Sequence, residues 1–235
     1  MSRSNSPLAL SVVKVTIPGS VEKTAAKIRR FDTDGFGFSH DYTWAVMAQS
    51  LRGVFVPKTV RASLAGKHPR IAKCVEALCV LGCDLKLETR SFADFPDSGL
   101  RPVSMLQWGP DVTVRVKASC WYIDKSDRPI LPILQPRKEP LDDQGLAVYL
   151  AFARQAFCKG DWSMARPQLI DLSGDDKDGV TAEVINESDL PTVSDELLGE
   201  YVKTYIEAKK LADSAKAPRL RKPKDKGMGD LFDRP

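Results

Sequence analysis

The chain has 235 residues, of which 43% are hydrophobic and 28% are charged, and its formal net charge is +4. This length and composition predict one sizeable domain around a hydrophobic core and exclude a chain too polar to fold. No stretch approaches the roughly 18 apolar residues of a membrane-spanning helix, and the N-terminus has no apolar signal-peptide segment. We therefore expect a cytoplasmic protein without a membrane partner.

The five cysteines include no Cys-x-x-Cys pair, and most of them lie in apolar surroundings. This pattern predicts buried free thiols in a reducing compartment. The chain has two histidines, so a structural zinc site would have too few well-spaced ligands.

The first third of the chain predicts helices. We expect a flexible polar leader over residues 1–13 and a helical N-terminal portion over residues 14–83. The expected helices are Val21–Phe31, Tyr42–Leu51, Lys58–Leu64 and Pro69–Leu81. Gly82 follows the last of them, and glycine is the residue most often found just past the end of a helix.

Residues 84–213 predict an α/β core of strands with one helix packed on them. The expected strands are Asp84–Arg90, Val112–Ile123, Pro129–Gln135, Pro167–Ser173 and Val180–Ile185, with a turn at Asp124–Arg128 and a helix at Leu141–Cys158. Ser194 is placed to cap a closing helix from Asp195 to about Ala212. The predicted fold class is α+β, with a mainly antiparallel mixed sheet (an αβββαβ-type core), N-terminal helices and a C-terminal helix.

The long central strand alternates in polarity. Thr113, Arg115, Lys117 and Ser119 fall on one face, and valines and an alanine fall on the other. Arg137 and Lys138 end the next strand nearby. A basic stripe on a sheet can follow the phosphates of a nucleic acid without reading its sequence, although a solvated sheet face with ordinary charges has the same pattern.

The order helix, three strands, helix, strand over roughly residues 84–210 resembles the core of the restriction-endonuclease-like (PD-(D/E)XK) nucleases, and looks most like their RecB and Cas4 branch. In that family an Asp on the second strand and a Glu/Asp-x-Lys on the third bind a divalent metal, and a Gln and a Tyr on the next helix hold DNA. The resemblance implies Asp111 and Gln135 as ligands of Mg²⁺ or Mn²⁺, Lys138 or Arg137 as the catalytic cation, and Gln144 and Tyr149 as DNA contacts.

The metal motif departs from the family pattern. Gln135 offers a neutral amide where Mg²⁺ requires a carboxylate. If the hairpin turn centres on Ser126, position 135 pairs with Lys117 and not with Asp111. We therefore expect a nuclease-like protein whose metal site is degenerate. It would bind or process DNA within a repair, replication or phage-defence complex, and an active metal-dependent nuclease is the alternative.

The helix motif departs as well, because Gln144 and Tyr149 are five residues apart, where the family has four. Five residues correspond to about 140° around a helix, so the two side chains would not share a face.

Residues 214–235 are rich in Lys, Arg, Pro and Gly and predict a disordered basic tail. Within this tail Asp230, Leu231 and Phe232 resemble the end of the peptide that binds the bacterial sliding clamp. The resemblance implies a protein partner for the tail. A third hypothesis is a protein–protein adaptor without nucleic-acid contact, which would use this tail together with Phe36 and Phe38.

Overall fold

The computed structural model describes residues 6–34, 39–55, 60, 62, 64–92, 101–174 and 179–215. Its fold class is α+β, as predicted. One sheet has five strands in the order β1-β4-β5-β6-β7, and a separate ribbon consists of β2 and β3. The strands are β1 Arg90–Ser91, β2 Val103–Trp108, β3 Val112–Lys117, β4 Cys120–Ile123, β5 Pro129–Gln135, β6 Arg166–Asp171 and β7 Glu183–Asn186. Every neighbouring pair is antiparallel except β5 and β6.

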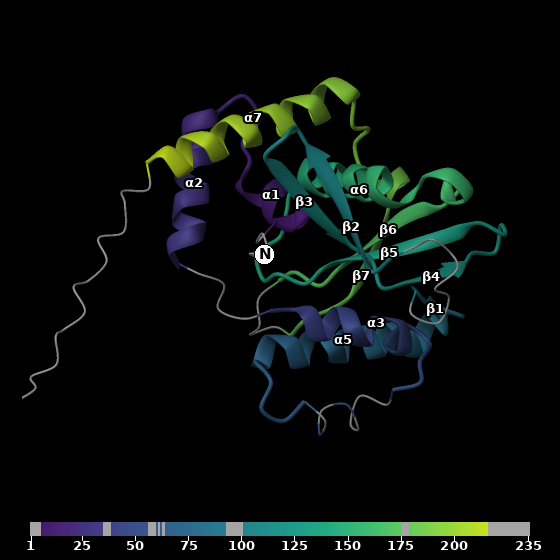
Figure 1. Cartoon of the computed structure of the whole chain (residues 1–235). Helices are drawn as coiled ribbons and strands as arrows, with labels where there is room; N and C mark the ends of the chain where they lie inside the picture. The colour runs from purple at the N-terminus through teal and green to yellow at the C-terminus, as the bar shows by residue number, and fades with distance from the viewer. Residues whose placement is uncertain are drawn as a thin grey trace, which may run out of the picture.

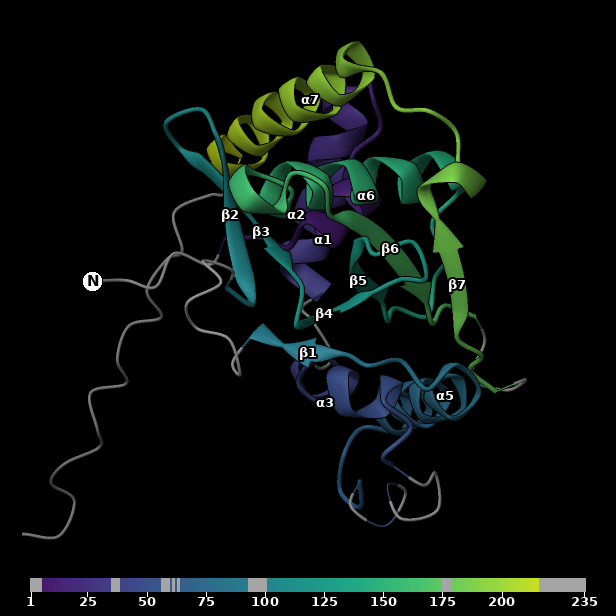
Figure 2. The same ribbon diagram turned by 90° about the vertical axis from the view of Figure 1, so that its right-hand side faces the viewer.

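Helices cover the five-stranded sheet on both sides (Figure 1). The helices are α1 Ala9–Val15, α2 Val21–Asp34, α3 Asp41–Leu51, α5 Pro69–Leu85, α6 Asp143–Phe157 and α7 Asp195–Ser214, with short 3-10 turns at Gly160–Trp162 and Glu187–Asp189. α6 lies on one side of the sheet and the pair α3 and α5 lies on the other (Figure 2). α6 also connects β5 to β6, because two parallel strands need a crossover between them.

The turn and strand at the centre of the predicted core are confirmed. β5 has the predicted bounds, and the turn before it is held by Asp124, whose Oδ1 accepts from the main-chain N–H groups of Ser126 at 2.8 Å and Arg128 at 2.9 Å. Tyr122 pairs with Ile130 across β4 and β5. The predicted pairing of position 135 with Lys117 is not formed, because Lys117 belongs to β3 and pairs with Val103, whereas Gln135 pairs with Asp171 of β6.

The predicted long strand Val112–Ile123 is divided into β3 and β4. β3 pairs with β2, whereas β4 pairs with β1 and β5, so the chain changes sheets at Ala118 and Ser119. β2 was not among the expected strands. The inner face of the β2–β3 ribbon is buried, and the Trp108 and Phe152 rings lie 4.8 Å apart there.

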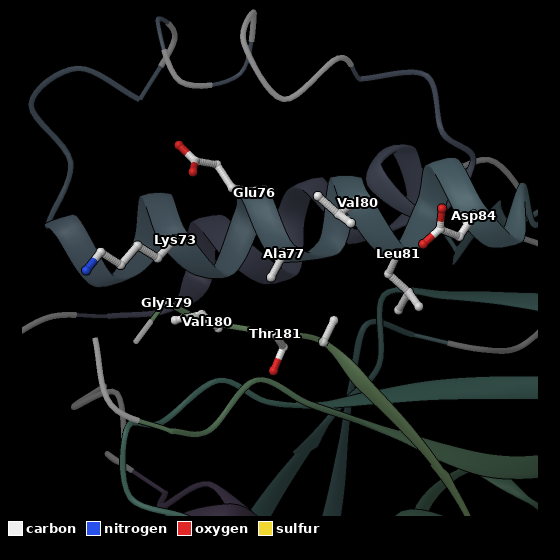
Figure 3. Close-up of a pocket in the computed structure, with 10 residues that line it drawn as sticks. Lys73, Glu76, Ala77, Val80, Leu81, Asp84, Gly179, Val180 and Thr181 are labelled. Carbon is white, nitrogen blue, oxygen red and sulfur yellow. The ribbon is translucent and has the colours of Figure 1, made fainter. Parts of the chain in front are cut away.

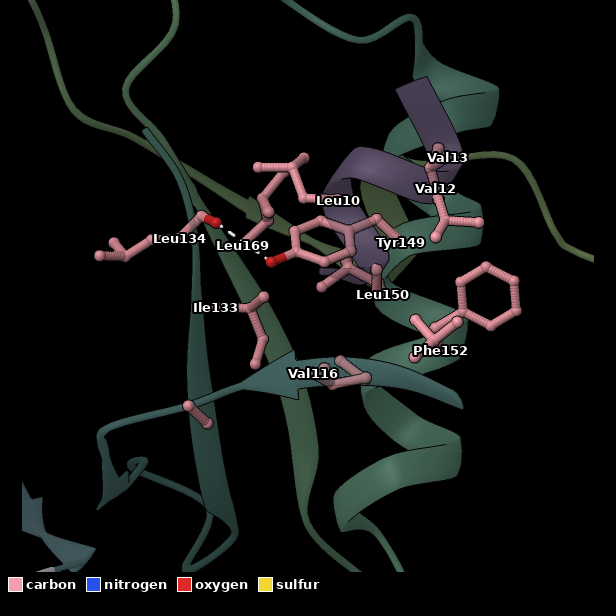
Figure 4. Packing of buried hydrophobic residues seen from close by; sticks show 14 of the residues in the cluster. Leu10, Val12, Val13, Val116, Ile133, Leu134, Tyr149, Leu150, Phe152 and Leu169 are labelled. Carbon is pink, nitrogen blue, oxygen red and sulfur yellow. Dashed lines mark hydrogen bonds between the residues drawn. The ribbon is translucent and has the colours of Figure 1, made fainter. Parts of the chain in front are cut away.

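The core is built where α1 and α6 meet β5 and β6 (Figure 4). Tyr149 of α6 lies among Leu10, Ile133 and Leu169, and its hydroxyl donates to the main-chain carbonyl of Leu134 at 3.2 Å. All of these side chains are buried, so burial of apolar surface is the main stabilising term.

The predicted leader needs correction over its second half. Residues 9–13 belong to α1, and five of its seven residues are buried hydrophobic side chains. The preceding segment lies beside the ribbon, since the Arg115 N–H donates to the Pro7 carbonyl at 2.8 Å. Residues 1–5, and residues 216–235 of the predicted tail, lie outside the described residues.

Gly82 does not end a helix, as the sequence had suggested. α5 continues to Leu85 and is followed by Lys86, whose φ of 48° is left-handed. A Cβ on Gly82 would lie 1.8 Å from the Ser50 carbonyl oxygen, so this glycine is required where α5 crosses α3. The extended α5 also replaces the start of the predicted strand Asp84–Arg90, which is reduced to β1.

The other helix predictions differ mainly at their ends. α2, α3 and α6 cover the expected segments, and the Ser194 hydroxyl accepts from the Leu197 N–H at 3.2 Å at the start of α7. The predicted helix over residues 58–64 falls partly outside the described residues. In the part of the chain that the structure describes, no helix has the length and apolar character needed to cross a membrane.

Candidate nucleic-acid interface

The outward face of the β2–β3 ribbon carries the stripe predicted from the sequence. Burial alternates along β3, where the valines are buried and Thr113, Arg115 and Lys117 are half-buried. The register pairs Lys117 with Val103, Arg115 with Met105 and Thr113 with Gln107. Directly paired residues point to the same side of an antiparallel ribbon, so these six side chains share one face.

Each polar residue of the stripe has a partner within the protein. The Arg115 Nε donates to the Ser6 carbonyl at 2.7 Å, and the Thr113 hydroxyl donates to the Gln107 amide oxygen at 2.7 Å. The Ser119 hydroxyl donates to the Trp44 carbonyl at 2.8 Å. These bonds attach the N-terminal segment and α3 to the ribbon while Arg115 and Lys117 keep part of their surface in solvent.

Lys117 connects the ribbon to the start of α3. Its ammonium group forms an ion pair with Asp41 and donates a hydrogen bond to that carboxylate, which holds the pKa of Asp41 below its ordinary value. Arg115 acts in the same direction. A carboxylate between two cations therefore stays ionised and orients them.

His40 precedes Asp41 and lies between the ribbon and the cations near the end of β5. Burial, followed by the nearby charges of Arg70, Arg137 and His68, lowers the pKa of His40 to about 4. The imidazole is therefore neutral at neutral pH. Its surroundings show that cations from α5 and from the end of β5 approach the same place.

Arg70 ties the carboxyl ends of β5 and β6 together. Arg70 is 2% exposed. Its guanidinium donates to the carbonyls of Pro136 at 3.4 Å and Arg137 at 3.2 Å after β5, and to those of Gly174 at 3.1 Å and Leu172 after β6. Four acceptors from two strands hold this edge in one arrangement.

Arg137 and Lys138 lie at this edge with different surroundings. The Arg137 guanidinium donates to the Ser11 hydroxyl at 2.6 Å and lies 5.3 Å from the centre of the Phe31 ring, and burial lowers its pKa. The Lys138 side chain is exposed. Arg137 therefore anchors α1 and α2 to the edge, and Lys138 faces solvent.

We call this set of side chains the basic track. It comprises Arg115 and Lys117 of the ribbon and Arg137 and Lys138 at the end of β5, and the neutral His40 lies near both groups. Asp41 contacts Lys117, and Glu139, beside Lys138, forms an ion pair with Lys14. The track runs from the ribbon to the carboxyl ends of the parallel strands, the edge at which open α/β sheets usually bind ligands.

The predicted metal ligands are not brought together. Asp111 is exposed in the turn between β2 and β3, whereas Gln135 is fully buried at the end of β5. The Gln135 amide donates to the Glu139 carbonyl at 3.1 Å and accepts from the Arg137 N–H at 2.9 Å. Asp111 belongs to the turn of the separate β2–β3 sheet and Gln135 to the five-stranded sheet, so the change of sheet separates the two residues.

The residues predicted on α6 are also separated. Gln144 is exposed in the first turn of the helix. Tyr149 is 3% exposed, burial raises the pKa of its hydroxyl, and that hydroxyl is bonded to Leu134. Tyr149 therefore holds α6 on β5. Its buried hydroxyl is not placed to make the DNA contact that was predicted for it.

Several predicted features lie outside the described residues, namely Phe36, Phe38, Asp230, Leu231 and Phe232. In the described ranges, no group of three or more His, Cys, Asp or Glu side chains is placed to hold a metal ion. All five cysteines are described and are free thiols.

A shallow groove of about 520 Å³ lies between α5 and the extended segment 179–182 (Figure 3). Lys73, Glu76 and Asp84 of α5 border it, together with Val80 and Leu81. This mixture of charges favours neither an anion nor a cation, so the basic track remains the candidate site.

Arg70 was not singled out in the sequence. Arg70 sits within a helical pattern whose polar positions give no sign of burial, and its acceptors lie 66 to 104 residues away. Only the fold brings it to the strand ends.

Comparisons with known proteins identify no family. No family model matches the chain, and no curated protein matches it. Among solved structures, one described as "Crystal structure of SSO0001" is similar to the chain at 14% sequence identity and a TM-score of 0.30, covering 69% of this chain and 74% of that one.

Proposed function

We propose that the chain is a DNA-binding protein that holds the phosphate backbone on the basic track. The track belongs to a nuclease-like fold with a degenerate metal site and serves a repair, replication or defence complex. The observation that carries this proposal is the set of cations on the ribbon, Arg115 and Lys117, and at the end of β5, Arg137 and Lys138, each of which keeps part of its surface exposed. Such cations neutralise phosphates and release counterions, which is the main source of sequence-independent affinity for DNA.

The element order agrees in part with the nuclease-like part of the proposal. A helix, α5, precedes the strands, and α6 and then β6 follow them, but five strands in two sheets, β1 to β5, stand where the resemblance has three. The parallel pair β5 and β6 places Arg137 and Lys138 at the carboxyl edge.

Binding without cutting is supported by the state of Gln135. Its neutral amide is buried and has bonds at both ends, and Asp111 lies at the far end of the ribbon. A one-metal or two-metal mechanism needs carboxylates that converge on one point.

The first experiment incubates the full chain with labelled single-stranded and double-stranded DNA, with and without Mg²⁺ or Mn²⁺, and reads retardation and cleavage on the same gels. We expect retardation without cleavage. Metal-dependent cleavage that Asp111→Ala abolishes would establish an active nuclease and overturn the degenerate site. Absence of retardation under all conditions would favour the adaptor hypothesis.

A matched pair of variants tests whether DNA binds at the basic track. Lys138→Gln removes an exposed charge from the track, whereas Lys203→Gln removes one from the exposed face of α7. We expect the first to weaken binding at low salt and to reduce the slope of log K against log[salt] by about 1, and the second to change neither. Equal effects of the two variants would contradict the assignment of the track.

A further inference from the structure

The outward face of the β2–β3 ribbon exposes two apolar side chains beside its cations. Met105 is 51% exposed and Val103 is 37% exposed, and each is paired across the ribbon with a cation, Arg115 and Lys117 respectively. Figure 2 shows the ribbon standing at one side of the molecule, next to α6. Its other face is packed on the core, so among the described residues the outer face is the one of the two left for a partner.

The third pair on this face is polar. The Gln107 amide accepts from the Thr113 hydroxyl at 2.7 Å and donates to the Gly109 carbonyl at 2.6 Å. These bonds fix the orientation of the amide. The face therefore presents a cation row on β3 and a row of Val103, Met105 and Gln107 on β2.

This combination matches one nucleic-acid surface. The major groove of B-DNA admits a two-stranded β-ribbon, and its base edges offer acceptors to Arg and thymine methyl groups to apolar side chains. Because Thr113, Gly109 and Pro110 hold the Gln107 amide, its contact with a base edge would use the second lone pair of its oxygen. The phosphates on either side of the groove would contact Arg115 and Lys117 or the adjoining track. A strand face with cations only would contact the phosphate backbone of the DNA and not its bases.

Charge on the ribbon suits the phosphates of DNA and disfavours a basic or a purely apolar protein partner. Among the six side chains of the paired face, two are cationic and none is acidic. Asp111 lies beyond the last pair, in the turn, and Asp41 is engaged with Lys117.

We propose that the outer face of the ribbon enters the major groove of a DNA duplex, with Met105 and Gln107 against base edges. This inference rests on the proposed DNA-binding function. It specifies that the bound DNA is a duplex and that the β2–β3 ribbon contacts its bases.

The test compares two substitutions of the same chemistry in the full chain. Met105→Glu places a carboxylate on the ribbon face, and Met164→Glu places one at an exposed methionine, 68% accessible, after the 3-10 turn that follows α6. Both sites are exposed, and unfolding curves confirm that each variant is folded. We expect Met105→Glu to weaken binding to a duplex by about tenfold or more, and Met164→Glu to leave it unchanged.

A second measurement changes the DNA. A duplex with glucosylated 5-hydroxymethylcytosine has its major groove obstructed while its phosphates are unaltered. We expect wild-type affinity for this duplex to fall to a similar extent.

The outcomes separate the two proposals. If Met105→Glu and the obstructed groove both leave the affinity unchanged while Lys138→Gln still lowers it, the ribbon proposal is overturned and backbone binding by the track stands. If no duplex is bound at any salt concentration, both are overturned. A preference for single-stranded DNA that Met105→Glu does not affect would also overturn the ribbon proposal.

Discussion

The guanidinium of Arg70 donates to the main-chain carbonyl of Arg137 at 3.2 Å, so a buried side chain of α5 holds the residue that begins the cationic end of β5. The same guanidinium reaches the chain after β6. The position of Arg137 and Lys138 therefore depends on a side chain that itself cannot reach a ligand.

Replacement of Arg70 should be strongly destabilising. Arg70→Met preserves much of the apolar stem but leaves four main-chain carbonyls without this donor, and we expect a loss of about 3–5 kcal/mol in the free energy of unfolding. Urea unfolding measures it, with Lys23→Met on the exposed face of α2 as the control, expected within about 0.5 kcal/mol of wild type. A loss below about 1 kcal/mol for Arg70→Met would show that water replaces the guanidinium at this edge.

Two helical glycines should respond in opposite directions to alanine. Gly82→Ala drives a Cβ into the Ser50 carbonyl and should cost about 1–3 kcal/mol or more, because α3 and α5 must separate. A Cβ added to Gly199 in α7 would meet no neighbouring atom within 4 Å. Gly199→Ala should therefore raise the free energy of unfolding by about 0.5–1 kcal/mol. The melting temperatures of the two variants, compared with that of the wild-type chain, measure both effects. Equal effects would mean that α3 and α5 are not in close contact.

His40 should make the protein less stable in mild acid. Its folded pKa of about 4 is below the ordinary 6.5, so below pH 6.5 the unfolded chain binds a proton that the folded chain does not. The free energy of unfolding should therefore fall between about pH 6.5 and 4, by about 1–2 kcal/mol after allowance for partial exposure.

The control for this prediction is His40→Gln, which should remove that part of the pH dependence. An NMR titration of the imidazole gives the pKa directly, and a midpoint near 6.5 would contradict the burial of His40 beside Arg70 and Arg137.

Tyr149 should matter for stability and not for DNA binding. Tyr149→Phe removes the hydroxyl that donates to Leu134 and should cost about 1–3 kcal/mol, with duplex affinity unchanged at a temperature where the variant is folded. Binding titrations and denaturant unfolding on one preparation test both parts. A variant of full stability with lost DNA affinity would restore the contact that the family resemblance implies.

Local signals were sufficient for part of the fold. β5 could be predicted because a turn built on Asp124 precedes it and Pro136 follows it, and α7 could be predicted because Ser194 and acids mark its start. The alternation along β3 likewise predicts which side chains face outward. In each case the information lies within a few residues.

Long-range contacts account for what was missed. α1 is only seven residues long and buried on most sides, so it has no amphipathic pattern to mark it. Gly82 has the sequence context of a helix end, and only the approach of Ser50 reveals its role. The roles of Arg70 and Met105 depend on partners in other elements of the fold, and periodicity along the chain does not reveal those partners.

The central claim is that cations of the basic track bind DNA phosphates, and the salt dependence of duplex binding by the wild-type chain tests it most directly. Each phosphate contact contributes a slope of about −0.9 to log K against log[salt]. With Arg115, Lys117, Arg137 and Lys138 on the track, we expect a slope of about −3 to −4. Affinity that does not change with salt, or no binding at low salt, would contradict the account.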